Sequence, residues 1–185
     1  PNEEESIEKI WQAESMAFDK QNWSVAIDGD SLGFFSGFKQ ISEKYSGYKG
    51  GQVATYNLGI SYLNNREYEN AIQTLKGVDF DDELLSTIAI GAIGDAYLQL
   101  GAVSDALNYY LSAYKRKDND LTSPIYMMKA AFCLEAQGDY DEAIRTYKLL
   151  YISYPNSELS VRAEKYMESL KLGEPVYKFE TDNIK

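Results

Sequence analysis

The stretch Ile90–Ala106, with the sequence IGAIGDAYLQLGAVSDA, decides the fold because two other segments repeat its pattern. Thr55–Ala71 (TYNLGISYLNNREYENA) and Met127–Ala143 (MMKAAFCLEAQGDYDEA) align with it, and the final alanines of the three copies are 35 and 37 residues apart. A repeat of this length is typical of stacked helical hairpins, because one hairpin buries its apolar face only against the next.

Corresponding positions of the copies carry residues of matching size. Small residues allow the two helices of a hairpin to approach closely, and bulky residues fill the space between hairpins. The predicted structural positions are Leu58, Gly59, Tyr62 and Ala71 in the first copy, Gly94, Tyr97, Ala106 and Tyr110 in the second, and Ala143, Tyr147 and Pro155 in the third.

This pattern resembles the tetratricopeptide repeat (TPR), whose period is about 34 residues. The resemblance implies an all-α, right-handed α-solenoid with a degenerate N-terminal hairpin and a C-terminal capping helix. The expected organisation is one helical domain over 1–172, with a degenerate hairpin and insertion over 1–51, repeats over 52–86, 87–123 and 124–156, a capping helix over 157–172, and a tail over 173–185.

Residues at turns and helix ends support this organisation. Gly101 and Gly138 suit the left-handed conformation that ends a first helix, and we expect Asn64-Asn65 to serve there in the first copy. Ser123-Pro124 predicts a helix start with a capping hydroxyl, and Asp139 with Glu142 predicts a capping box.

The N-terminal part of the chain predicts a helix over 2–20. Asn2 and Glu5 form a capping pair at its start. Its apolar positions predict one buried side, made of Ile7, Ile10, Trp11, Met16 and Ala17.

Composition narrows the function classes. The 185 residues carry a formal charge of −11, which disfavours nucleic acid and an anionic membrane surface as partners. The absence of histidine and the single cysteine, Cys133, remove the commonest general base and any multi-cysteine metal site. We therefore expect no catalytic residue, no metal and no cofactor.

Two acidic segments allow a structural interpretation as well as a functional one. Asp28–Gly33 is similar to the start of a calcium loop, but Leu32 and Lys39 stand where that loop needs ligands, so a tight connection is favoured. The cluster Asp79–Glu83 predicts a solvated loop that caps the next helix. Paired carboxylates also serve glycoside hydrolysis, but no spacing here selects a pair.

The TPR resemblance implies that the inner face of the first helices grips a peptide or partner protein. The residues carried over to that role are Tyr56, Asn57, Ile60, Asp95, Met128, Lys129 and Phe132. Their mixture favours an apolar or helical segment. The chain's own N-terminal helix or a second copy of the chain are alternative occupants, so a homo-oligomer remains open.

Three short strings resemble a group of bacterial cell-envelope TPR proteins: Ala26–Asp30, Gly37-Phe38 and Gly91–Tyr97. This resemblance implies a membrane anchor upstream of Pro1 and a location on the periplasmic side of the envelope, with the cytoplasm as the alternative. The expected function is a non-catalytic protein-interaction scaffold in envelope protein handling or complex assembly. A glycan-binding module is the alternative, since 14% of the residues are aromatic.

Overall fold

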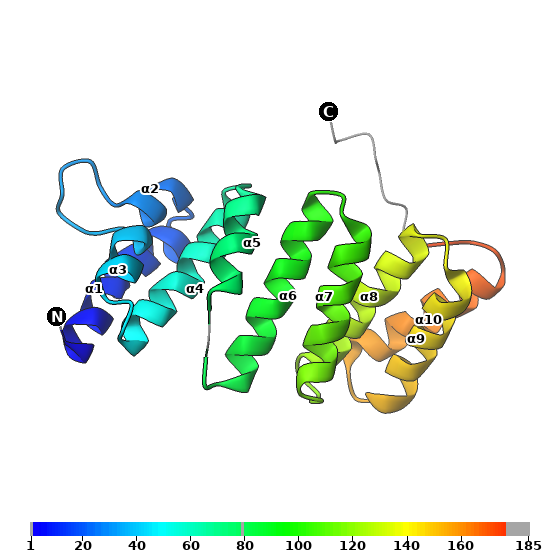
Figure 1. Cartoon of the computed structure of the whole chain (residues 1–185). Coiled ribbons are helices and arrows are strands. Elements are labelled where there is room, and N and C mark those ends of the chain that lie inside the picture. Colours follow the sequence, from blue (N-terminus) through cyan, green and yellow to red (C-terminus); the bar gives the residue numbers. More distant parts are fainter. Residues whose placement is uncertain (1, 79, 177–185) are drawn as a thin grey trace. The chain divides into compact units, whose positions relative to one another are not determined.

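The computed structural model describes residues 2–78 and 80–176, and all of its regular elements there are helical. The contacts divide the chain into two compact units, Pro1–Asp81 and Asp82–Lys185. Unit 1 contains α1 (Glu3–Glu14), the π-helical turn η1 (Ser15–Asp19), α2 (Trp23–Asp28), α3 (Phe38–Lys44), α4 (Lys49–Asn64) and α5 (Tyr68–Lys76). Unit 2 contains α6 (Glu83–Gln99), α7 (Val103–Arg116), α8 (Ser123–Ala136), α9 (Tyr140–Ser153) and α10 (Glu158–Lys171) (Figure 1).

Unit 2 is a run of helices in which each packs against the next in sequence, from α6 to α10. In unit 1, α4 packs against α5 and is also contacted by α1, α2 and α3. The predicted all-α, helical-repeat fold is therefore confirmed. Of the tail predicted over 173–185, residues 177–185 lie outside the described residues.

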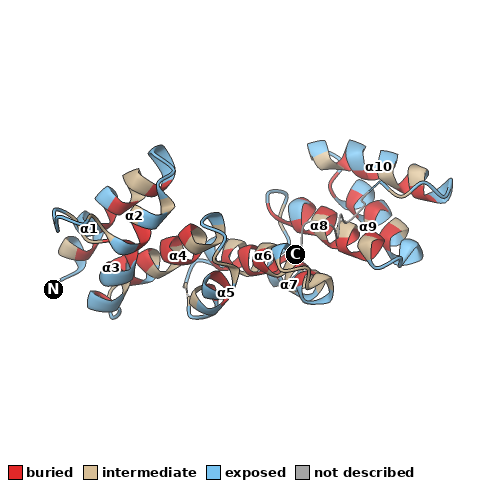
Figure 2. Ribbon diagram, turned by 90° about the horizontal axis from the view of Figure 1, so that it is seen from above, coloured by how far each residue is buried: buried red, intermediate tan, exposed pale blue. Residues whose placement is uncertain are grey.

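Small residues sit at close approaches between helices, as the repeat pattern predicts. A Cβ atom added to Gly94 would lie 2.7 Å from the ring of Tyr110, and one added to Gly59 would lie 2.5 Å from Leu75. Figure 2 shows that α6 is buried along much of its length, as expected for a helix whose glycines and alanines face its neighbours. The other structural positions are buried at Leu58, Ala71, Ala106, Tyr110, Ala143 and Tyr147, partly buried at Tyr62 and Tyr97, and exposed at Pro155.

The turns inside the hairpins follow the prediction in two of the three copies. Gly101 and Gly138 have φ angles of 75° and 77°. In the first copy, however, the left-handed residue is Arg66, with φ 64°, and the expectation for Asn64-Asn65 is wrong. The reason is that α4 continues through Asn64, whose side chain donates to the carbonyl of Ile60.

Helix starts also follow the sequence with one exception. The carboxylate of Asp139 accepts from the backbone N–H of Glu142, and the side chain of Asn2 accepts from that of Glu5. The hydroxyl of Ser123 caps no helix: it accepts from the backbone N–H of Asn119 in the preceding turn.

The N-terminal helix differs most from expectation. The chain leaves the α-helical path at Ser15 and makes one π-helical turn. Ile7 and Trp11 are exposed, at 59% and 70%, although the sequence predicts them on the buried side. The stripe that is buried is narrow and mostly small, with Ser6, Ile10, Ala13 and Ala17. Small side chains suffice because α1 lies close to its neighbours.

Candidate functional site

In unit 1, α1 covers part of α4 where the resemblance places the inner face. The amide of Asn57 donates to Oε1 of Glu14 at 2.8 Å, and Asn57 is only 5% exposed. At the other end, the carboxylate of Glu3 accepts from the backbone N–H groups of Lys49 and Gly50. The chain's own N-terminal helix therefore uses a residue that was expected to bind a partner.

The other two unit 1 candidates have different surroundings. The ring of Tyr56 packs edge-on against Phe80, with centroids 5.7 Å apart, and burial raises the pKa of its hydroxyl. Ile60 is partly buried. Their roles in binding stay predictions, but neither projects fully into solvent.

In unit 2, an ion pair connects α6 with α8 at two predicted inner-face positions. Nζ of Lys129 lies 2.5 Å from Oδ1 of Asp95, and the hydroxyl of Tyr110 donates to the same oxygen at 2.7 Å. The ammonium also lies 5.4 Å from the centroid of the Tyr110 ring. About a third of each charged side chain stays exposed, 34% for Lys129 and 35% for Asp95. This pair is positioned by buried aromatic packing and still meets solvent.

The remaining two candidates lie deeper. Met128 is buried in the core formed by α8, α9 and α10. Phe132 is partly buried, and its ring packs against Tyr147 and against Tyr166 of α10. The structure thus brings Asp95 and Lys129 together, while Met128 and Phe132 serve the packing of the helices beneath them.

Glu135 lies at an inner-face position of the third copy by the same TPR resemblance, but it is not among the residues predicted to bind a partner. It is 3% exposed, and its carboxylate accepts from the hydroxyl of Tyr147 and, at 2.9 Å, from the backbone N–H of Val176. Burial and the neighbouring carboxylate raise the pKa of Tyr147. The repeat alignment identifies its position, but its burial and its contacts with Tyr147 and Val176 depend on residues far from it in the sequence.

Two observations on the described residues concern metal binding and nucleophilic chemistry. They hold no cluster of three or more potential metal ligands. Cys133 is buried, and desolvation, together with the charge of Asp95, raises the pKa of its thiol to about 12, which leaves it protonated at neutral pH. Among the helices described, none is both long and apolar enough to cross a bilayer.

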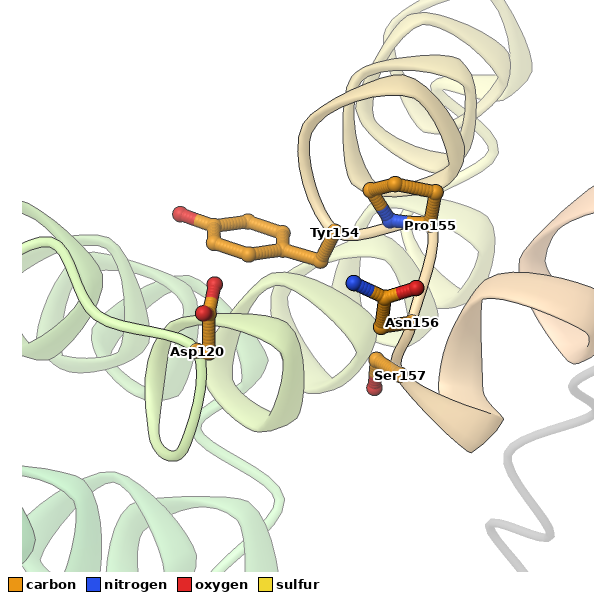
Figure 3. Close-up of a pocket in the computed structure, with 5 residues that line it drawn as sticks. All are labelled: Asp120, Tyr154, Pro155, Asn156 and Ser157. Carbon is orange, nitrogen blue, oxygen red and sulfur yellow. The ribbon is translucent and has the colours of Figure 1, made fainter.

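A small hollow lies at the turn between α9 and α10. Figure 3 shows it lined by Asp120, Tyr154, Pro155, Asn156 and Ser157. The hydroxyl of Tyr154 donates to Asp118, and burial, with this carboxylate, raises its pKa to about 12. The hollow has a volume of about 90 Å³, which is below the range of ordinary ligand pockets. The hydrogen bond between Tyr154 and Asp118 connects the α9–α10 turn to the loop before α8.

Carboxylates of the two acidic segments accept hydrogen bonds from backbone N–H groups, one in a loop and one at a helix start. The carboxylate of Asp30 accepts from the backbone N–H groups of Leu32 and Phe35, which folds the connection between α2 and α3. Asp82 accepts from the N–H of Leu85 and so caps α6. Asp79 lies outside the described residues.

The helical hairpins define a class: this is an all-α helical-repeat protein. Residues 92–158, from within α6 to the start of α10, match a family model described as tetratricopeptide repeat. No curated protein matches the chain. The family match supports a TPR protein; such repeats generally mediate protein–protein interaction and are generally non-catalytic.

Proposed function

We propose that this protein is a non-catalytic scaffold that binds a peptide or a partner protein through the inner face of unit 2. The Asp95–Lys129 pair carries the proposal, because it is a charged pair held at inner-face positions of α6 and α8 with about a third of each side chain exposed. A partly exposed ion pair contributes little to stability, on the order of 0–1 kcal/mol. Its charges remain available to orient a partner.

The partner should combine an apolar surface with a few charges. Ile125, on the first turns of α8, is 39% exposed, and Lys129 follows it four residues later on the same side of the helix. An amphipathic or extended peptide presents this combination. The net charge of −11 favours partners with cationic groups and disfavours nucleic acid.

The cellular setting rests on resemblance. The strings Ala26–Asp30, Gly37-Phe38 and Gly91–Tyr97 support a role in the bacterial cell envelope, in protein handling or complex assembly. Immunoblotting of cytoplasmic, periplasmic and membrane fractions tests this location.

The binding proposal is tested by selecting peptides from a displayed library on the full chain and measuring their affinity for variants. Lys129→Gln removes one of the two partly exposed charges of the Asp95–Lys129 pair, and Lys148→Gln removes an exposed charge from α9 as the matched control. We expect selected peptides to lose about tenfold in affinity with Lys129→Gln, as for a charge-assisted contact, and to keep it with Lys148→Gln. Equal affinity for both variants and the wild type would place binding elsewhere.

A further inference from the structure

The outer side of α1 carries exposed apolar residues beside carboxylates. Ile7 and Trp11 are 59% and 70% exposed, and Glu4 and Glu8 are exposed as well. These four residues have the spacing i, i+3, i+4 and i+7, so they share one face of the helix. The face that α1 turns to solvent is therefore both apolar and acidic.

The outer side of α9 has the opposite charge. Leu149 and Ile152 are 47% and 61% exposed, and Lys148 is exposed beside them. Arg145 pairs with Glu142 at 2.6 Å but stays 66% exposed, and no carboxylate follows Glu142 in this helix, although the whole chain has a net charge of −11. The spacing from Arg145 to Ile152 is again i, i+3, i+4 and i+7. This outer face is therefore both apolar and basic.

The two faces complement each other residue by residue. When α1 and α9 are aligned in parallel, each carboxylate lies opposite a cation and each apolar residue lies opposite another. The pairs are Glu4 with Arg145, Ile7 with Leu149, Glu8 with Lys148 and Trp11 with Ile152. Opposite charges across a contact select the partner and the register. Because the chain carries both faces, a second copy of it offers each face its complement.

We propose that α1 of one copy of this chain packs against α9 of another copy. The two faces are different, so the contact is heterologous and joins copies into a ring or an open chain. A contact between two single helix faces is small, and we expect a dissociation constant on the order of 100 µM, as for weak interfaces. Neither face includes the inner-face residues of α6 and α8, so this association is independent of the proposed function.

A lipid surface is the competing partner for α1. Tryptophan is common where proteins meet the membrane interface, but an anionic leaflet attracts basic residues and repels carboxylates. Glu4 and Glu8 lie on the same face as Trp11, and α9 offers cations at the matching positions. The charges therefore favour a second copy over a membrane.

The test is sedimentation equilibrium of the full chain from about 20 µM to about 1 mM, which brackets the expected dissociation constant. Glu8→Lys changes the net charge from −11 to −9, which reduces the general repulsion between copies, but it sets two cations against each other in the contact. Lys148→Glu sets two carboxylates against each other there. Glu69→Lys, at an exposed position of α5, changes the net charge as Glu8→Lys does and is the matched control. All three side chains are exposed, and circular dichroism checks that the helices are retained.

We expect Glu8→Lys and Lys148→Glu each to weaken self-association by about tenfold or more, and Glu69→Lys to leave it unchanged or slightly stronger. The double variant restores an opposite-charge pair, so its affinity should return to within about threefold of the wild type. An equimolar mixture of the two single variants should also associate, because α1 of one then meets α9 of the other with opposite charges. Trp11→Ala should weaken the association by about tenfold, as loss of an aromatic anchor does.

Three sedimentation results would overturn the proposal: a wild type that is monomeric at about 1 mM, equal effects of Glu8→Lys and Glu69→Lys, or no recovery in the double variant. Binding of the wild type, but not of Trp11→Ala, to phosphatidylcholine vesicles without self-association would also overturn it, since α1 would then face lipid. Peptide affinities for the inner face are measured far below about 100 µM protein, where the copies are separate, so Lys148→Gln keeps its use as a control there.

Discussion

The inner-face positions of α4 and α8 are equivalent in the repeat, but the two helices differ in what lies over them. α4 begins with Gly50, Gly51 and Ala54, all buried, and α1 packs against it. α8 carries Lys129 and Phe132 in its middle, and Lys129 stays about one-third exposed. Gly50 lets α1 lie directly on the start of α4, and Asn57 is covered by its contact with Glu14, whereas Lys129, the residue of α8 equivalent to Asn57, stays partly exposed. Repeat position alone therefore does not identify a binding face, because the chain itself covers one of two equivalent positions.

The largest expected effect concerns the closed core beneath the inner face of α8. Burial raises the pKa of the Cys133 thiol from 9.0 to about 12, so its thiolate fraction at pH 8 is about a thousandfold lower than that of an unfolded chain. We expect alkylation by iodoacetamide to be slower by at least this factor in the native state than in guanidinium chloride.

The same pKa shift fixes a pH dependence. The native state holds the thiol proton more tightly than the unfolded chain, so this contribution to stability is complete below pH 9 and is lost as the pH rises toward 12. Denaturant titrations at pH 8 and pH 10.5 measure it, and Cys133→Ala should lessen the decrease. If iodoacetamide alkylated Cys133 in the native state as fast as in the unfolded chain, unit 2 would have to open around Cys133.

We expect Gly50→Ala to weaken the packing of α1 against α4. An added Cβ would collide with Ser6 of α1, including its backbone carbon at 2.8 Å, so α1 has to move. We expect a loss of about 1–3 kcal/mol in the free energy of unfolding, measured by urea titration. Gly47→Ala is the control, since nothing lies within 4 Å of its added Cβ. Equal stabilities of the two variants would mean that α1 is not tightly docked.

Ala106→Leu tests the packing inside unit 2. Ala106 is completely buried in the core that contains Tyr110 and Ala113, and three added carbon atoms have no space there. We expect a loss of about 1–3 kcal/mol, seen as a lower melting temperature by circular dichroism. Asn108→Leu, on the exposed side of the same helix, should change stability by about 0.5 kcal/mol or less. An unchanged melting temperature for Ala106→Leu would contradict the repeat alignment.

The fold could be predicted from the sequence because its determinants are local and periodic. The positions of Gly94, Ala106 and Tyr110 carry residues of similar size in each repeat. This regular spacing can be recognised in the sequence without knowing which residues these positions contact. Trp11 shows the limit of this reasoning. An apolar residue at helical spacing predicts a buried side, but the neighbours of α1 leave room only for a narrow stripe of small residues.

The candidate site was less predictable, because its character depends on contacts between residues far apart in the chain. Asn57 and Glu14 are 43 residues apart, and Glu135 and Val176 are 41 residues apart. Position in the repeat placed Asn57 and Met128 on the binding face, but helix packing buries both. Lys129 and Asp95 were placed there as well, and they meet because α6 and α8 are the first helices of neighbouring hairpins.

The smallest expected effect is a difference in unfolding free energy between a substitution at the buried Asn57 of α4 and one at the partly exposed Lys129 of α8. Asn57→Ala removes the donor to Glu14 from a buried position, and we expect it to destabilise the protein by about 1–2 kcal/mol, since the carboxylate loses a partner. Lys129→Gln removes one member of a partly exposed pair, and we expect a loss below about 1 kcal/mol, shrinking further in 0.5 M salt because exposed charges are screened. Urea titrations at low and high salt measure both. If Lys129→Gln costs as much as Asn57→Ala, the ion pair is part of the core of unit 2, and the inner face of α8 is closed in the way that the face of α4 is.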